Sequence, residues 1–180
     1  MSAGAAYSPA GASMRKRGKY IMSNLLILGA GGMGHMIYEM AMESGEYEKV
    51  SFLDDAKKES TVVGKLIDYS DFHGEYDCAV AAFGNNKLRL SWIEKLMACG
   101  YTVPAIVHPS AVVSASAEIG AGCFVMPRAV INTKARLDIG CLVNSGAVVD
   151  HDAVLEKGCH ISLGSVIRAY CQISAFRKVA

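Results

Sequence analysis

The sequence predicts two domains: a small open α/β sheet, followed by a parallel β-helix built from six-residue repeats. Two observations carry this prediction. Short apolar segments alternate with helical periodicity between residues 24 and 104, and a strict period of six replaces that pattern from residue 106 onward. The chain has 180 residues, of which 52% are hydrophobic and 19% are charged, and this is enough to bury two small cores.

The first domain alternates strands with helices. We expect strands at 24–28, 50–54 and 77–83, a last strand opening at 102, and helices at 36–44 and 86–99. The first and third strands end at glycines, and Gly100 follows the second helix as its C-terminal cap. Strands separated by helices predict an open parallel sheet that helices cover.

The second domain repeats with a period of six. Twelve consecutive hexads run from Ile106 to Arg177 without an insertion. Their second position is always Val, Ile or Leu, and their sixth is Ala, Cys or Ser in all but the last. Each hexad makes one flat face of a triangular coil, so we expect about four coils with positions two and six pointing inward. Residues 176–180 break the pattern, and we expect them either to cap the coils or to mark an early end.

Cys123, Cys141 and Cys159 lie one coil apart and should stack in an interior column. A metal or redox column and simple apolar filling are the two interpretations, and filling is favoured because Ala and Ser take the equivalent positions. The chain has no C-x-x-C pair, which argues against disulfides and a thiolate-bound zinc ion.

Charge and hydropathy exclude several classes of function. The formal net charge is +1, and the basic cluster at 15–19 leaves the rest of the chain slightly acidic, unlike a nucleic-acid-binding protein. No apolar run is long enough to span a membrane, and no secretory signal is recognisable, so we expect a cytoplasmic protein. Residues 1–21 are expected to be a disordered extension, and Met22 is an alternative start.

A glycine-rich turn, Gly29–Gly34, follows the first strand and precedes a helix. The glycines permit a tight turn, and the helix N-terminus can bind an anion such as a pyrophosphate. Asp54 and Asp55 end the second strand on the same rim, where open α/β sheets bind ligands. A nucleotide or nucleotide-sugar suits this turn best, a purely structural turn is the alternative, and a full NAD-binding fold is too large for the domain.

Gly84, Asn85 and Asn86 follow the third strand and should reach the same rim. The two asparagines either contact the ligand or cap the helix that begins there. Arg89, one turn further, is expected on the solvated face of that helix.

His151 stands between Asp150 and Asp152 at an outward corner of a hexad. Carboxylates that hold an imidazole favour its protonated form, so this histidine suits a general base, and a solvated surface histidine is the alternative. His108 and His160 occupy other hexad positions and other coils, so the three histidines do not converge as a zinc site requires, and we expect no metal.

The segments GAGGMGH, FLDD, AFGNNKLR and IVHPSAVVSASAEIG, followed by hexads that include VVDHD, together resemble the bacterial sugar O-acyltransferase family. That family includes sialic acid O-acetyltransferases and UDP-amino-sugar N-acetyltransferases of surface-glycan synthesis. The resemblance covers residues 24 to about 166. It implies a Rossmann-like nucleotide-sugar-binding domain over residues 22–104 and a left-handed β-helix acyltransferase domain over residues 105–180.

The resemblance also implies an activity and its residues. It implies acetyl-CoA as acyl donor, a nucleotide-sugar or sialic acid as acceptor, and a homotrimer with active sites between subunits. The catalytic base falls on His151, its acidic partner on Asp152, and an acetyl-CoA contact on His160. Substrate contacts fall on Gly31, Gly32, Met33, Asp54, Asp55 and Gly84.

Two features depart from the family pattern: Met33 stands where a histidine is usual, and the regular repeat ends earlier than in many members. The early end favours the alternative function, a non-catalytic nucleotide-sugar-binding trimer. An NAD-dependent oxidoreductase is the third hypothesis.

Overall fold

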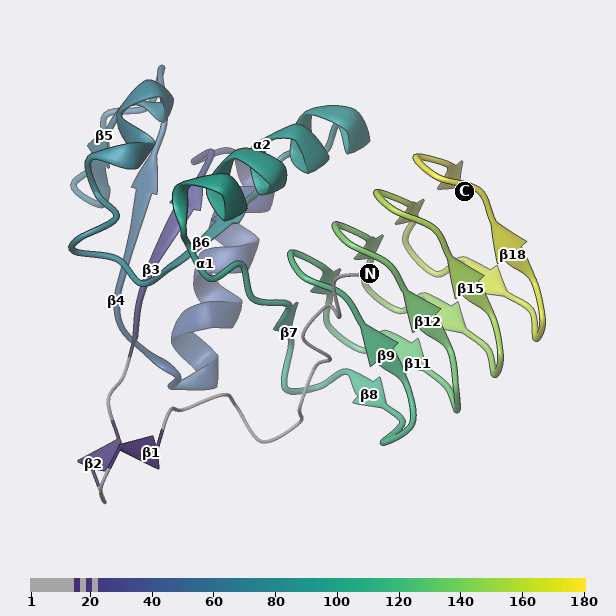
Figure 1. Cartoon of the computed structure of the whole chain (residues 1–180). Coiled ribbons are helices and arrows are strands. Elements are labelled where there is room, and N and C mark those ends of the chain that lie inside the picture. The colour runs from purple at the N-terminus through teal and green to yellow at the C-terminus, as the bar shows by residue number, and fades with distance from the viewer. Residues whose placement is uncertain (1–14, 17–18, 21–22) are drawn as a thin grey trace. The chain divides into compact units, whose positions relative to one another are not determined.

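The computed structural model describes residues 15–16, 19–20 and 23–180 (Figure 1). The chain folds into two compact units. The first contains the described residues up to 84 together with residues 91–104, and the second contains residues 85–90 and 105–180. The extension predicted over residues 1–21 lies outside the described residues, except for β1 (Arg15–Lys16) and β2 (Lys19–Tyr20), which pair antiparallel.

A four-stranded parallel sheet forms the centre of the first unit. β3 (Ser23–Leu28) lies between β4 (Tyr47–Leu53) and β6 (Cys78–Ala81), and β5 (Val62–Gly64) forms the edge beside β4. The last four residues of β3 and all of β6 are buried, as expected for parallel strands covered on both faces.

Two α-helices and a short 3-10 helix accompany this sheet. α1 (Gly32–Ser44) packs on β3 and β4 and buries Ile37 and Ala41, and α2 (Asn86–Cys99) buries Ile93 and Leu96. Neither β5 nor the 3-10 helix η1 (Leu66–Ser70) was predicted. The strand expected at residue 102 is a single bridge between Cys78 and Thr102.

The second unit is a left-handed parallel β-helix of two-residue strands, which Figure 1 shows as stacked coils from green to yellow. Each strand pairs with the strand one coil later, so the coil has three flat sheets: β7-β10-β13-β16-β19, β8-β11-β14-β17 and β9-β12-β15-β18. The strands are β7 (Ile106–Val107), β8 (Val112–Val113), β9 (Glu118–Ile119), β10 (Phe124–Val125), β11 (Val130–Ile131), β12 (Arg136–Leu137), β13 (Leu142–Val143), β14 (Val148–Val149), β15 (Val154–Leu155), β16 (His160–Ile161), β17 (Val166–Ile167), β18 (Gln172–Ile173) and β19 (Lys178–Val179).

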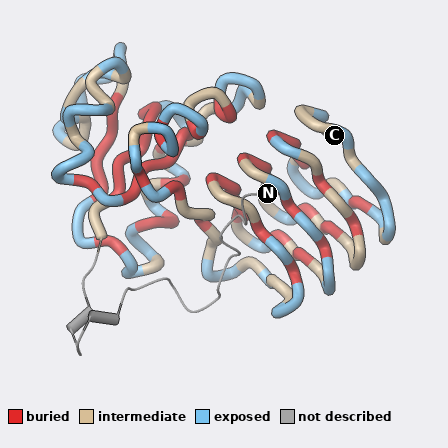
Figure 2. The backbone as a smooth tube through the Cα atoms, viewed as in Figure 1, coloured by how far each residue is buried: buried red, intermediate tan, exposed pale blue. Residues whose placement is uncertain are grey.

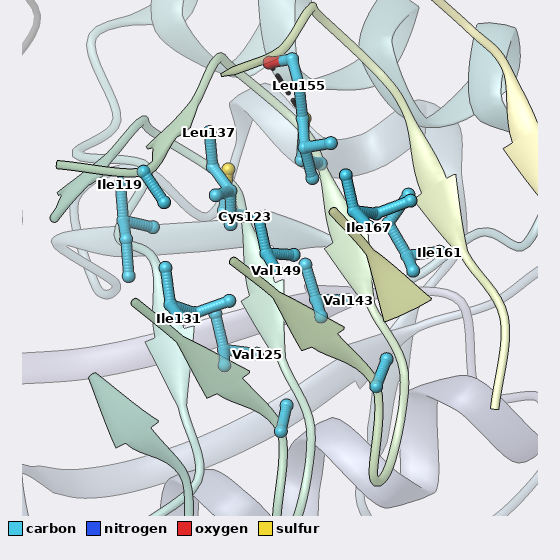
Figure 3. Packing of buried hydrophobic residues seen from close by; sticks show 14 of the residues in the cluster. Ile119, Cys123, Val125, Ile131, Leu137, Val143, Val149, Leu155, Ile161 and Ile167 are labelled. Atoms are coloured by element: carbon cyan, nitrogen blue, oxygen red, sulfur yellow. Dashed lines mark hydrogen bonds between the residues drawn. The ribbon is translucent and has the colours of Figure 1, made fainter. Parts of the chain in front are cut away.

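Positions two and six of the hexads fill the interior of the coil, which Figure 2 shows as repeated red segments along each sheet. From Ile119 to Ile167 the second-position side chains are at most 3% exposed, and Figure 3 shows them pointing toward one another. The interior is therefore the aliphatic column that the period of six predicts.

The cysteine column lies inside this core. Cys123, Cys141 and Cys159 are fully buried, and their thiols donate to the backbone carbonyls of Asp138, Glu156 and Ser174 at 3.1, 3.2 and 3.2 Å. Hydrogen bonding between neighbouring thiols, together with burial, raises the pKa of Cys141 and of Cys159. Buried thiols that stay protonated and donate to carbonyls support the apolar-filling interpretation.

Each corner of the coil is a tight turn whose conformation the sequence analysis did not predict. At most corners the backbone N–H of position six donates to the carbonyl of position three, as from Ala147 to Asn144 at 3.1 Å, and from the third hexad onward position five has positive φ. This is the pattern of a type II turn, in which glycine is favoured at position five. Five other residues adopt this conformation with φ between 56 and 61°: Arg128, Lys134, Asp152, Tyr170 and Phe176.

The coil also continues to the last residues of the chain. β19 pairs with β16, with Lys178 opposite His160, and Val179 packs against the core as the next second-position residue. Phe176 takes the corner position with φ of 61°. The prediction that residues 176–180 break the repeat was therefore wrong: Arg177 replaces the small sixth-position residue, but the backbone keeps the period.

Gly146→Ala is expected to lower the free energy of unfolding by about 1 kcal/mol, since a Cβ there meets no atom within 4 Å and the whole cost comes from the positive φ of 69°. Lys134→Gly removes a Cβ from the same hexad position and should not lower stability. Denaturant unfolding of both variants measures the difference, and an equal loss in both contradicts the assignment of corner strain.

Candidate functional site

The glycine-rich turn leads from β3 into α1 and leaves the helix N-terminus open. Gly31 is the N-cap residue with extended backbone, no side chain caps the helix, and no acidic residue lies in its first turn. A Cβ on Gly31 or Gly32 would meet no atom within 4 Å. The first backbone N–H groups of this 13-residue helix can therefore donate to an anion.

Close packing explains the other glycines of this turn. A Cβ on Gly34 would collide with the carbonyl oxygen of Gly29, which itself has a φ of 100°. On the same rim, a Cβ on Gly84 would lie 3.9 Å from the terminal methyl carbon of Met33. The structure thus brings Met33 and Gly84, two residues predicted to contact substrate, next to one another.

The Asp54 carboxylate holds the glycine-rich turn against the end of β4. Its Oδ2 accepts the backbone N–H of Ala30 at 2.8 Å, and its Oδ1 accepts those of Ala56 and Lys57, both at 2.9 Å. Burial raises the pKa of Asp54, but these three donors outweigh it and the net shift is downward. Asp55 accepts the Leu66 N–H through Oδ1 at 3.1 Å. Sequence reasoning missed this positioning role.

Asn85 and Asn86 have different roles at the start of α2. Asn85 Oδ1 accepts the backbone N–H of Leu88 at 3.0 Å, which is the bond of a helix N-cap. Asn86 donates from Nδ2 to the carbonyl of Phe176 at 3.0 Å and accepts a bond from Arg89. The capping interpretation thus suits Asn85, while Asn86 fastens the helix start to the β-helix.

Arg89 is fully buried, so the prediction of a solvated side chain was wrong. Its Nε donates to the carbonyl of Gly140 at 2.9 Å and its Nη2 to that of Gly158 at 3.3 Å, both at corners of the coil. Burial lowers the pKa of this guanidinium. Residues 85–90 consequently group with the β-helix. The sequence holds no signal for this contact because the acceptors are backbone carbonyls.

His151 lies at the corner that follows β14, held by the aspartates on both sides. Asp150 Oδ1 accepts the backbone N–H of His151 at 2.8 Å and the Asn132 Nδ2 at 2.9 Å, and these two donors lower the pKa of Asp150. The His151 Nδ1 lies 3.0 Å from Asp152 Oδ2, and the two side chains are 45% and 34% exposed. Because a carboxylate only accepts, a neutral imidazole in this pair carries its proton on Nδ1 and keeps Nε2 as a proton acceptor.

The ring of Tyr170 packs perpendicular to the imidazole of His151, with centroids 5.1 Å apart. Sequence reasoning missed this neighbour. The period of 18 residues could have found it, because Tyr170 stacks one coil above Asp152.

His160 lies on a different face of the coil from His151, at the first position of β16. It is 9% exposed, with Leu142 of β13 and Lys178 of β19 in register on its two sides. Burial, followed by the positive charges of Lys178 and Arg89, lowers the pKa of His160, so its imidazole is neutral at pH 7. The sheet that contains β15 separates the two histidines along the chain.

A small parallel α/β unit with an open helix N-terminus, joined to a β-helix with a partly exposed His–Asp pair, defines a two-domain hexapeptide-repeat protein. Residues 24–96 match the PglD N-terminal domain. The acetyltransferase domain of PglB from Neisseria gonorrhoeae FA1090, solved in complex with acetyl coenzyme A, is 34% identical with a TM-score of 0.85, over 88% of this chain and 80% of that one. The chain belongs to this family of bacterial hexapeptide-repeat sugar acyltransferases.

Two further relatives extend the comparison. UDP-N-acetylbacillosamine N-acetyltransferase of Bacillus subtilis (strain 168) is 32% identical over 119 residues, which cover 58% of this chain and 52% of that protein. The chain thus spans about half the length of this curated relative. A mutant perosamine N-acetyltransferase from Caulobacter crescentus, solved with CoA and GDP-perosamine, shares the fold with a TM-score of 0.64 at 23% identity, over 89% of this chain and 90% of that one.

None of the helices in the described part of the chain has the length and hydropathy that a membrane span requires.

Asp54→Asn is expected to lower the free energy of unfolding by roughly 1–3 kcal/mol at pH 7. Both Asp54 oxygens accept backbone N–H groups, whereas an asparagine has one oxygen and would turn its NH2 group toward one of these N–H groups. Asp55→Asn is the matched control, since one amide oxygen still accepts the Leu66 N–H. The pKa of Asp54 is lower in the folded state than in the unfolded state. Its contribution to stability is therefore present above the unfolded-state pKa and is lost as the pH falls through the folded-state pKa. Denaturant unfolding between pH 7 and 3 measures this, and an equal effect of both substitutions contradicts the role of Asp54.

Proposed function

We propose that the chain is an acetyl-CoA-dependent acetyltransferase that acts on an amine or hydroxyl of a nucleotide-sugar in surface-glycan synthesis. The observation that carries the proposal is the partly exposed His151–Asp152 pair, 3.0 Å apart, on the β-helix of a family member. The PglB domain that it resembles was solved with acetyl coenzyme A, and the Bacillus subtilis relative is named as an N-acetyltransferase of a UDP-sugar.

His151 acts as the general base in direct transfer. Its Nε2 takes the proton of the acceptor amine or hydroxyl while that nitrogen or oxygen attacks the thioester carbonyl carbon. Asp152 holds Nδ1 and stabilises the imidazolium that forms. The tetrahedral intermediate collapses with cleavage of the C–S bond, the acetyl group stays on the sugar, and CoA leaves as the thiolate that recovers a proton. The column cysteines are buried in the core, so they do not serve as acyl carriers.

His160 is proposed to contact acetyl-CoA. Its lowered pKa keeps the imidazole neutral, so it can donate one hydrogen bond to acetyl-CoA without carrying a charge. We also propose a cytoplasmic location. Use of acetyl-CoA fits that location, and so do the six cysteines, which are all described and form no disulfide.

The acceptor is proposed to bind at the rim of the α/β unit. The N-terminus of α1 suits the phosphates of a nucleotide-sugar, since its first N–H groups are open and the turn carries no side chain that blocks them. A UDP-amino-sugar is the preferred class because of the named relative, and free sialic acid is the alternative. The residues proposed to contact the acceptor are Gly31, Gly32, Met33, Asp54, Asp55 and Gly84.

Assembly as a homotrimer is proposed to use the sheet β8-β11-β14-β17. The first residue of each of its strands is a valine, and the two end valines, Val112 and Val166, are each 62% exposed. A flat column of valines is the kind of surface that a second chain covers. His151 lies two residues after the end of β14, so a subunit on this face is proposed to lie beside the base.

His151→Ala is expected to lower acetyl transfer by about 10²-fold or more, because a positioned base contributes at least that factor. CoA-thiol release with acetyl-CoA and a UDP-amino-sugar measures the rate. His108→Gln, in the first coil, is the control and should keep wild-type turnover. Near-wild-type turnover in His151→Ala overturns the assignment of the base.

Val166→Lys is expected to convert the trimer to monomers and to lower turnover, because it places an unpaired charge in the proposed interface. Gln172→Lys is the matched control, at the same hexad position on β18 of a neighbouring sheet. Sedimentation equilibrium reports the mass of each variant. A monomeric wild type, or an unchanged trimer in Val166→Lys, contradicts assembly through the valine face.

A further inference from the structure

Tyr170 is an exposed aromatic residue that contacts the proposed base. Its ring lies perpendicular to the His151 imidazole at 5.1 Å, and its backbone N–H donates to the His151 carbonyl at 3.2 Å. The residue is 74% exposed, so Tyr170 is not part of the core. It belongs to the corner one coil after Asp152, which places the two on successive coils beside the same imidazole.

The backbone of Tyr170 makes this placement costly. Its φ is 61°, and a bulky side chain in this left-handed conformation is strained. Gly164, one corner earlier, adopts the same conformation without that cost. A largely exposed ring recovers little of the strain through burial of apolar surface. Arg128, Lys134, Asp152 and Phe176 adopt the same conformation, so the ring contact with His151, and not the strain, distinguishes Tyr170.

The His151 side chain has few constraints without this ring. It is about half exposed, and Asp152 is bonded to only one of its two ring nitrogens. A single hydrogen bond allows the imidazole plane to turn about the Nδ1–carboxylate direction, whereas a ring packed against it blocks that rotation. Tyr170 and Asp152 thus restrain the imidazole through different contacts, one by packing and one by a hydrogen bond.

We propose that Tyr170 is a positioning residue for His151, holding the imidazole in the orientation in which Nδ1 donates to Asp152 and Nε2 faces the acceptor proton. This inference rests on the proposed function, in which His151 is the base. A residue that orients a base acts in the transition state, so its loss lowers kcat more than it raises KM for either substrate.

The test compares Tyr170→Gly, which removes the ring, with Tyr170→Phe, which keeps it. Arg128→Gly is the matched control, because Arg128 is an exposed non-glycine residue with a φ of 58° at a different corner of the coil. Three quantities are measured on each full-length variant: the Tm, kcat with both KM values, and the NMR chemical shift and side-chain rotamer averaging of His151.

Tyr170→Gly is expected to lower kcat about tenfold at little-changed KM, as expected for a misplaced catalytic group. Its Tm should stay at or above that of the wild type, because relief of backbone strain offsets the lost ring contact. The His151 resonances should shift and show averaging between rotamers. Tyr170→Phe and Arg128→Gly should both keep wild-type kcat and wild-type His151 resonances.

Wild-type kcat in Tyr170→Gly overturns the inference, and so does an equal loss of kcat in Arg128→Gly. A loss of kcat that follows a fall in Tm shows a structural role and overturns it too. If the wild type transfers no acetyl group to any acceptor, the proposed function has failed, and NMR alone decides the inference. Unchanged His151 resonances in Tyr170→Gly then contradict positioning by Tyr170, whereas rotamer averaging supports it.

Discussion

Hydrogen bonding between successive coils is the constraint on which the β-helix and its site depend. The backbone N–H groups of the strands donate to the next coil, as from Val148 to the carbonyl of Ser165 at 2.9 Å, so residues 18 positions apart stack on one another. This register turns the sequence into columns. It stacks the three buried cysteines, places Asn132 beside Asp150, and sets Tyr170 one coil above Asp152. A single inserted residue would shift every later column, so the uninterrupted period protects both the core and the environment of His151.

In the α/β unit, the main structural constraint is that the N-terminus of α1 stays open. The Asp54 carboxylate accepts the Ala30 N–H and ties the turn to β4, while Gly34 lets α1 approach the carbonyl of Gly29. Neither contact uses the first N–H groups of α1, so these stay available for an anion. The ionised Asp54 carboxylate can therefore lie beside a site for a negatively charged ligand, because three backbone N–H groups donate to its oxygens and stabilise its charge.

Much of this architecture could be predicted from the sequence, because packing inside a narrow coil permits few residue types. The aliphatic second position and small sixth position predicted the interior, and the glycine-rich turn between an apolar strand and a helix predicted the rim. The remainder depends on groups that leave no pattern. Arg89 donates to backbone carbonyls, which any residue supplies, so its burial could not be recognised. Arg177 departs from the small residues of the sixth position, so the pattern predicts an end to the repeat there, although β19 continues it. The contact of Tyr170 with His151 is different, because the 18-residue period places Tyr170 one coil above Asp152 and could have predicted it.

The central claim is that this chain transfers an acetyl group from acetyl-CoA to a sugar, with His151 as the base and Asp152 as its partner. Release of the CoA thiol by the purified wild-type protein, with and without a panel of UDP-amino-sugars and sialic acids, tests it most directly. The account predicts thiol release that depends on one of these acceptors and appears together with a stoichiometric amount of acetylated sugar. Thermal stabilisation by a UDP-sugar without thiol release in any mixture would contradict it and would identify the chain as a nucleotide-sugar-binding protein.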